Sequence, residues 1–256
     1  QTLLGHLLQR DRAWLYAWGE KAVAEDLASP YRELIAQRRA GVPVAQLTGS
    51  RDFWTLQLQV DRHTLIPRPE TEHLVEKALQ LGDPRRPLRV LDLGTGSGAI
   101  ALALASERPA WRITAVERSG AALRVAQRNA AQHALRNIDF LQGSWFEPVS
   151  GRFELIISNP PYIAQDDPHL ARGDLRFEPT TALSAGPDGL DDIRAIVRAA
   201  PQYLASGGWL LFEHAYDQGA ACRRLLQQRG FAQVFTDLDL AGLERLSGGQ
   251  YPLDHE

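Results

Sequence analysis

One tetrapeptide in this chain has residue types that suit the binding of a planar amino group: Asn159-Pro160-Pro161-Tyr162. It follows an apolar run, Phe153 to Ser158, that predicts a buried strand, and prolines end a strand because they lack an N–H and have a fixed φ. The backbone carbonyl of Pro160 and the side-chain carbonyl of Asn159 are then two convergent acceptors, and the ring of Tyr162 is an aromatic wall beside them. We interpret the tetrapeptide as a clamp for a planar –NH2 group. A proline-rich turn with an asparagine stop is the structural alternative.

A glycine-rich segment upstream has the pattern of a nucleotide-binding loop. The apolar run from Leu88 to Leu93 predicts a strand, and residues 99–106 predict a helix. The loop that joins them is Asp92-Leu93-Gly94-Thr95-Gly96-Ser97-Gly98. Glycines let the backbone turn sharply and approach a ligand, and the helix N-terminus offers free N–H groups. The next predicted strand, Ile113 to Val116, is followed by Glu117, which is placed to accept hydrogen bonds from both hydroxyls of a ribose.

The glycine loop alone fits two classes of nucleoside cofactor. It also satisfies the loose dinucleotide pattern G-x-G-x-x-G/A, and Glu117 would serve the ribose of NAD as well. Gly98 and Asp92 favour S-adenosylmethionine. The tetrapeptide favours it more strongly, because a dehydrogenase has no need of an amide clamp.

The two segments together resemble class I S-adenosylmethionine-dependent methyltransferases that act on planar amino or amide nitrogen. Other parts of the chain are similar to the HemK/PrmC family, the protein-(glutamine-N5) methyltransferases of peptide chain release factors. These parts are Val42–Gly49, Phe53-Trp54, Leu65–Glu72 and Arg176–Pro179. The resemblance covers nearly the whole chain. The segment at which the sister enzymes for a ribosomal protein usually differ is Pro67-Arg68-Pro69-Glu70-Thr71-Glu72.

This resemblance implies a reaction and a set of site residues. The methyl donor is S-adenosyl-L-methionine, the product is S-adenosyl-L-homocysteine, and the acceptor is N5 of a glutamine in the GGQ loop of a class 1 release factor. The implied catalytic residues are Asn159, Pro160 and Tyr162, and substrate binding adds Pro161. The implied cofactor-binding residues are Asp92, Gly94, Thr95, Gly96, Ser97, Gly98, Glu117, Trp145 and Asn159. Trp145 lies near the adenine in the family, although a core aromatic has the same sequence signal.

The chain departs from the family pattern at two places. Glu117 stands where the family usually has Asp, and the longer acid still reaches a ribose with changed geometry. The family's amino-terminal helical domain is longer than the part present here, so we expect that the chain starts at Gln1 partway into that domain.

Composition restricts the class of protein and its partners. A content of 44% hydrophobic and 23% charged residues is typical of a globular protein, and a net charge of −3 gives no general attraction to nucleic acid. Cys222 is the single cysteine, which excludes an internal disulfide and fits a reducing, cytoplasmic compartment. The histidines lack metal-ligand spacing, and no apolar stretch is long enough to cross a membrane, so we expect no metal site and no membrane partner.

The pattern of apolar segments predicts an α/β fold, a Rossmann-like, mainly parallel seven-stranded sheet with a small N-terminal helical domain. We expect helices over 1–50 (an apparently truncated domain), a strand or hairpin linker over 51–69, and a catalytic domain over 70–256. Strands are expected near 88–93, 113–117, 138–142, 153–158, 208–213, 231–237 and 243–248. Helices are expected near 98–106, 120–133, 189–204 and 216–229. The last two strands follow each other directly and predict an antiparallel hairpin, and residues 165–181 predict a long polar loop suited to a lid.

Three other functions fit parts of the sequence. A glutamine methyltransferase of a ribosomal protein shares the same chemistry. An adenine-N6 nucleic-acid methyltransferase also needs a clamp for a planar –NH2 group, but it requires a basic face or a target-recognition domain, and neither is apparent. An inactive binding module is disfavoured because Asp92, Asn159 and Tyr162 are intact.

Overall fold

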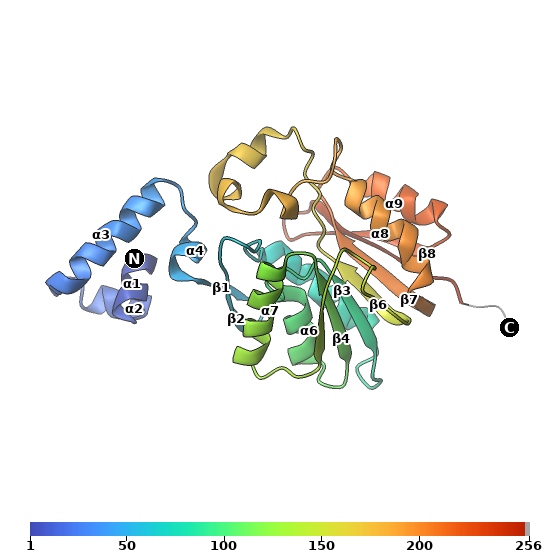
Figure 1. Ribbon diagram of the computed structural model, residues 1–256, viewed down its shortest axis with the longest axis horizontal. Coiled ribbons are helices and arrows are strands. Elements are labelled where there is room, and N and C mark those ends of the chain that lie inside the picture. The colour runs from blue at the N-terminus through green and yellow to red at the C-terminus, as the bar shows by residue number, and fades with distance from the viewer. Residues whose placement is uncertain (254–256) are drawn as a thin grey trace.

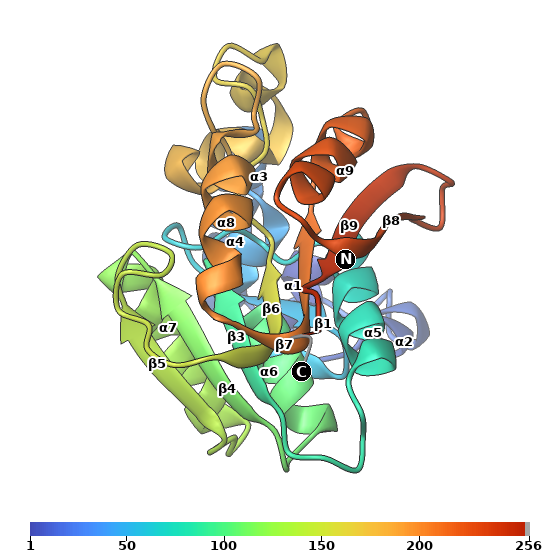
Figure 2. The same ribbon diagram turned by 90° about the vertical axis from the view of Figure 1, so that its right-hand side faces the viewer.

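The computed structural model describes residues 1–253 and is built around a seven-stranded sheet. In space the strands follow the order β5-β4-β3-β6-β7-β9-β8 (Figures 1 and 2). Their bounds are β3 Arg89–Leu93, β4 Arg112–Glu117, β5 Ile138–Gln142, β6 Phe153–Ser158, β7 Leu204–Glu213, β8 Ala232–Leu238 and β9 Glu244–Gln250. The first five strands of the spatial order are parallel, and β9 runs antiparallel to both of its neighbours. The expected class I methyltransferase fold is therefore confirmed.

Helices cover both faces of the sheet because successive residues of each parallel strand point to opposite sides. Val90 packs in one apolar cluster with the buried side chains of α5 (Glu72–Leu81) and α6 (Ala99–Glu107). Its neighbour Leu91 packs in the opposite cluster with those of α8 (Asp191–Ala199) and α9 (Gly219–Gln228). Helix α7 (Gly120–Gln132) contacts α6, β4 and β5, on the α6 side of the sheet.

The strand register brings four strand ends to one edge of the sheet. Leu93 of β3 is paired with Val116 of β4 on one side and with Ser158 of β6 on the other. Ser158 is in turn paired with Phe212 of β7. Since these strands are parallel, the residues that follow them all emerge at the same carboxyl edge, where α/β folds bind their ligands.

Most predicted boundaries lie within a few residues of the observed ones, but one region differs. Strand β7 begins at Leu204 rather than near 208, and α8 ends at Ala199 rather than near 204. Leu204 pairs with Phe153, and an irregularity follows before Leu155 pairs with Trp209. The predicted helix was too long because a short 3-10 turn, Ala200–Gln202, contains Pro201 and leads directly into the strand.

The amino-terminal part is helical, as expected, and extends from one end of the molecule (Figure 1). Its helices are α1 Thr2–Leu8, α2 Arg12–Ala17, α3 Glu25–Arg39 and α4 Val44–Thr48. A hairpin of β1 (Ser50–Phe53) and β2 (Leu56–Gln59) follows, in the segment where the alternating pattern predicts a strand or hairpin. The division at residues 50 and 69 stays a prediction.

The segment after β6 is made of short turns. It contains the 3-10 turns Pro168–Ala171, Gly173–Phe177 and Thr180–Ala182. Arg38 forms an ion pair with Asp174 at 3.1 Å, and Gln46 donates a hydrogen bond to the carbonyl of Phe177 at 3.0 Å. These contacts join the amino-terminal helices to a segment that also borders the carboxyl edge of the sheet.

Residues 1–253 contain neither a membrane-spanning helix nor a cluster of metal ligands. No helix in this range combines the length and apolar character that a membrane crossing requires. Within the same range, histidine, cysteine and acidic side chains form no group suited to a metal ion.

Candidate active site

The glycine loop turns sharply at the end of β3 and is tied to the neighbouring strand. The amides of Gly94 and Thr95 both donate to the carbonyl of Val116 at 2.9 Å. Gly94 has a φ of +74°, and a Cβ at this position would lie 3.3 Å from the ring of Trp145. Glycine is therefore needed here both for the backbone conformation and for the close approach of the tryptophan.

Glu117 lies at the end of β4 and lines the pocket beside the glycine loop. One of its carboxylate oxygens accepts from the amide of Gly96 at 3.0 Å, and the other accepts from the amide of Ser119 at 2.8 Å. Each carboxylate oxygen has two lone-pair sites, so both oxygens still have capacity to accept a ligand hydroxyl. The two backbone contacts fix the orientation of the carboxylate and therefore the directions of its remaining lone pairs.

Asp92 is buried directly behind the loop. One carboxylate oxygen accepts from the hydroxyl of Thr95 at 2.6 Å, and the other is buried with no hydrogen-bond partner among the described residues. Burial is the main cause that raises the pKa of Asp92 to about 7. An unpartnered carboxylate oxygen fits a site that receives a cationic amino group, which is the group that S-adenosylmethionine would bring.

The predicted cofactor-binding residues fall into two groups. Those that line the pocket are Gly94, Gly96, Glu117, Trp145 and Asn159. Those that lie behind or beside it are Asp92, Thr95 and Ser97, all buried, and Gly98, which is the N-cap of α6. The residues of the second group do not line the pocket and lie in or directly behind the loop that does.

Trp145 forms a wall of this pocket in an unusual backbone conformation. Its φ is +48°, in the left-handed region that non-glycine residues rarely adopt. Asp192 also lines the pocket; burial raises the pKa of Asp192, and the side chain of Trp145 opposes the rise. Such a conformation at a pocket wall is typical of a residue held in place for binding.

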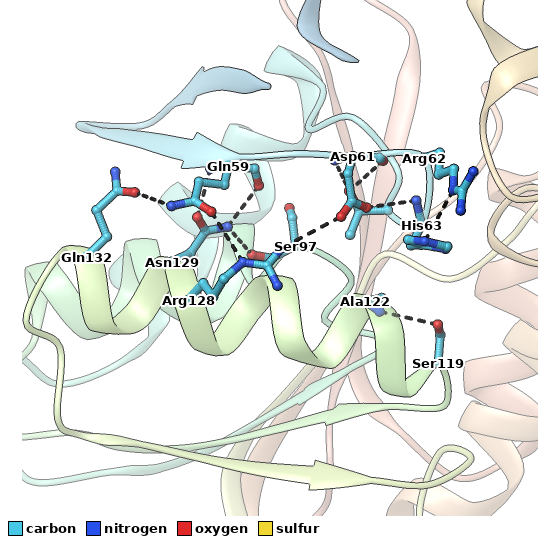
Figure 3. A network of polar contacts seen from close by, with 11 residues as sticks. Gln59, Asp61, Arg62, His63, Ser97, Ser119, Ala122, Arg128, Asn129 and Gln132 are labelled. Carbon is cyan, nitrogen blue, oxygen red and sulfur yellow. Dashed lines mark hydrogen bonds and ion pairs between the residues drawn. The ribbon is translucent and has the colours of Figure 1, made fainter. Parts of the chain in front are cut away.

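Another part of the pocket wall, residues 62–65, was not predicted from the sequence. This wall follows β2, and Asn129 of α7 anchors the end of that strand (Figure 3). The Asn129 carbonyl accepts from the amide of Gln59 at 2.7 Å, and its NH2 donates to the carbonyls of Gln59 at 3.0 Å and Ser97 at 2.9 Å. One buried side chain therefore joins the glycine loop to the strand that precedes this part of the wall. A polar residue on the apolar face of a predicted helix was the available signal.

The tetrapeptide lies where this pocket meets a second one. Asn159 and Pro161 line both pockets, and Pro160 and Tyr162 line the second. The side-chain NH2 of Asn159 donates to the hydroxyl of Thr71 at 3.0 Å, and the hydroxyl of Tyr162 donates to Glu213 at 3.0 Å. Thr71 and Glu213 were also missed as site residues. Thr71 lies in the family segment Leu65–Glu72, to which the sequence assigned no role in the clamp, and the available signal for Glu213 was an acid at the end of an apolar strand.

The second pocket is bordered by two segments that are joined through a partly buried ion pair. Arg68 forms this pair with Glu178, whose other oxygen accepts from the amide of Ile66 at 3.0 Å. Burial raises the pKa of Glu178, although the charge of Arg68 opposes the rise. The pair connects the segment before α5 to the turns after the tetrapeptide, so it holds the pocket's two borders together.

Comparisons with known proteins agree with this arrangement. The model of the PrmC N-terminal domain matches residues 1–49, and that of the methyltransferase small domain matches residues 71–174. A release factor glutamine methyltransferase of Xylella fastidiosa is 52% identical over 98% of this chain and 92% of its own length. One of Escherichia coli is 48% identical over 98% of this chain and 91% of its own length.

A solved structure supports the fold. A methyltransferase from Pyrococcus furiosus is superposable with a TM-score of 0.60 at 18% identity, over 88% of this chain and 100% of that chain. The high identity to the relatives from Xylella fastidiosa and Escherichia coli over nearly the full length leads to one conclusion, with which the glycine loop and the tetrapeptide agree. The chain belongs to the release factor glutamine methyltransferase family.

Proposed function

We propose that this protein transfers a methyl group from S-adenosylmethionine to the side-chain amide nitrogen, N5, of a glutamine in the GGQ loop of a class 1 peptide chain release factor. The observation that carries this proposal is the meeting of two pockets at Asn159 and Pro161. One pocket has the features of a nucleoside site, and the other is narrow and lined by the clamp. A methyl transferase needs this arrangement because donor and acceptor must touch at one point.

The first pocket is the proposed cofactor site. Glu117 would accept from the ribose hydroxyls, and the ring of Trp145 would stack on the adenine. Gly94 and Gly96 would let the backbone approach the ligand closely, and the unpartnered oxygen of Asp92 would favour the cationic amino group. S-adenosylmethionine supplies an electrophilic methyl group on a sulfonium when it is bound.

The clamp would hold and activate the acceptor amide. An amide nitrogen is a poor nucleophile because its lone pair is delocalised into the carbonyl. The side-chain carbonyl of Asn159 and the backbone carbonyl of Pro160 would accept the two N–H hydrogens, and these hydrogen bonds strengthen as positive charge grows on nitrogen. Tyr162 would hold the glutamine side chain flat. Alignment of this kind is worth roughly 7–11 kcal/mol in favourable cases.

The hydrogen bonds in the clamp do not favour a side-chain general base. The hydroxyl of Tyr162 already donates to Glu213, and burial together with the Glu213 charge raises the pKa of Tyr162. The buried Glu213 accepts from Tyr162 and from Thr71. The proton would therefore leave to water after methyl transfer, when the nitrogen has become acidic.

A methyl-transfer assay with labelled S-adenosylmethionine tests the proposal. The acceptors to compare are a release factor, the same factor with its loop glutamine changed to asparagine, a ribosomal protein and DNA. We expect label only on the first, located on the glutamine by mass spectrometry, because the shorter side chain withdraws the amide by about one methylene. Label on the ribosomal protein or on adenine would replace the proposal with one of those two functions. In the cell, the reaction would take place in the cytoplasm.

A further inference from the structure

A buried carboxylate lies directly beneath the clamp. Glu213 ends β7, which is paired in register with β6, so it emerges next to Asn159. It is 3% exposed. One oxygen accepts from the hydroxyl of Thr71 at 2.7 Å, and the other accepts from the hydroxyl of Tyr162 at 3.0 Å. Both ends of the clamp are therefore connected to a single side chain.

The direction of these hydrogen bonds fixes the orientation of Asn159. An ionised carboxylate only accepts, so the single hydroxyl proton of Thr71 is given to Glu213. The Thr71 oxygen can then only accept from Asn159, which must present its NH2 to it, at 3.0 Å. The carbonyl of Asn159 consequently points the other way. Rotation of the carboxamide by 180° would instead present the Asn159 NH2 to the acceptor amide, whose own two N–H groups are also donors.

Tyr162 is held at its other end as well. Gln218 donates to the backbone carbonyl of Tyr162 at 2.9 Å and to the carbonyl of Asp188 at 3.1 Å. A Cβ at Gly189 would lie 2.2 Å from the Tyr162 carbonyl, so only glycine permits this contact. The backbone of Tyr162 therefore has a fixed place, and from it the hydroxyl reaches Glu213.

We propose that Glu213, acting through Thr71, is a positioning residue that orients the carboxamide of Asn159 so that its carbonyl faces the acceptor amide. This inference rests on the proposed function of the clamp and adds the residue that decides which end of the Asn159 carboxamide faces the acceptor. Thr71 links the two residues, since its hydroxyl donates to Glu213 and accepts from the NH2 of Asn159.

The same hydrogen bonds make the clamp sensitive to protonation. A protonated Glu213 can donate to Thr71, and the Thr71 hydroxyl is then free to donate to Asn159 and to reverse the carboxamide. Charged or titratable groups that act on Glu213 are Tyr162, Arg245 on β9 and Glu70 before α5, and burial is the main cause that raises the pKa of Glu213. Turnover should therefore fall at acid pH, because Thr71 then no longer holds the Asn159 carboxamide in one orientation.

Two variants of one residue separate positioning from simple stability. Thr71→Val keeps the shape of the side chain and removes the hydroxyl, so we expect kcat to fall roughly 10–100-fold, less than the 10²–10³ for loss of a contacting group. Thr71→Ser keeps the hydroxyl and should restore most of kcat. Thr236→Val is the matched control, because it removes a hydroxyl whose partner is Ser247 on the neighbouring strand. Calorimetry should show the same affinity of all three variants for S-adenosylhomocysteine.

A double-mutant cycle tests whether Thr71 acts through Asn159. In an Asn159→Ala background, Thr71→Val should have almost no further effect on kcat. In a separate measurement, the single variant Thr71→Val should lack the fall in kcat at acid pH that the wild type shows. Equal kcat for Thr71→Val and Thr71→Ser, or additive effects in the cycle, would overturn the inference. A wild-type protein that does not methylate a release factor would instead overturn the proposed function, so the two failures are distinguishable.

Discussion

The contact between Glu117 and the glycine loop gives a quantitative prediction for cofactor binding. The carboxylate accepts from the amides of Gly96 and Ser119, at 3.0 and 2.8 Å, while it faces the pocket. Glu117→Ala removes the proposed ribose acceptors and also leaves the Gly96 amide without this partner. A hydrogen bond to a charged group contributes about 1.5–3 kcal/mol. We therefore expect the Kd for S-adenosylhomocysteine to rise roughly 10- to 150-fold.

Glu117→Gln is the informative comparison because it keeps the size of the side chain. A carboxamide has one acceptor oxygen, whereas the wild-type carboxylate uses both oxygens to accept from backbone N–H groups. The NH2 of Gln must therefore face either Gly96 or Ser119, donor against donor. We expect Glu117→Gln to weaken binding nearly as much as Glu117→Ala, while Glu117→Asp weakens it less, because a shorter carboxylate still accepts twice.

Isothermal calorimetry with S-adenosylhomocysteine measures all four proteins, and circular dichroism checks that each is folded. NAD is the control ligand and should give no heat with any of them. Wild-type affinity in Glu117→Ala, or tight binding of NAD, would refute the assignment of this pocket and of Glu117 within it. Full affinity in Glu117→Gln alone would refute the argument that both oxygens are needed.

The remaining predictions concern the clamp, the loop and its anchor. Asn159→Ala should lower kcat by roughly 10²–10³ with little change in cofactor affinity, and full activity would exclude a role in the clamp. Burial raises the pKa of Asp92 from a usual 3.8 to about 7, so the folded protein favours the neutral carboxyl. The contribution of this carboxyl to the free energy of unfolding is present below pH 4 and is lost as pH rises towards 7. In urea unfolding, the free energy of unfolding of Asp92→Asn should therefore rise relative to that of the wild type by up to about 4 kcal/mol between pH 4 and 8. A difference between the two proteins that does not change with pH would contradict this. Asn129→Ala should lower the free energy of unfolding by about 2–4 kcal/mol and weaken cofactor binding, whereas Gln132→Ala, which loses only exposed contacts, should do neither.

The sheet could be predicted from the sequence because its strands are local apolar runs separated by helical patterns. The glycine loop and the tetrapeptide each follow such a run, so both were expected at the carboxyl edge. The start of β7 was placed wrongly because the irregularity between Phe153 and Leu155 depends on pairing with another strand. Pairing of this kind has no signal within the strand itself.

The sequence suggested site residues only where a short segment follows a predicted strand. Thr71 and Glu213 are separated by 142 residues, and the hydrogen bond between them exists only because α5 begins beside the end of β7. Asn129 joins Gln59 and Ser97, which come from a hairpin and a loop that no local pattern relates. The site residues predicted from the sequence follow strands, whereas the residues that hydrogen-bond to them come from elements that meet only in three dimensions.

The strand order explains why the glycine loop and the tetrapeptide border the same pocket. β3 carries the glycine loop, and its two neighbours are β4, which ends in Glu117, and β6, which precedes Asn159. β7 then adds Glu213 on the far side of the clamp. Because Leu93, Val116, Ser158 and Phe212 are joined in register, a shift of one strand would displace the residues that follow it by about 3.3 Å per residue. The backbone hydrogen bonds of the core therefore set the spacing of the glycine loop, Glu117 and the tetrapeptide, and a methyl transfer at this edge requires that spacing to be held.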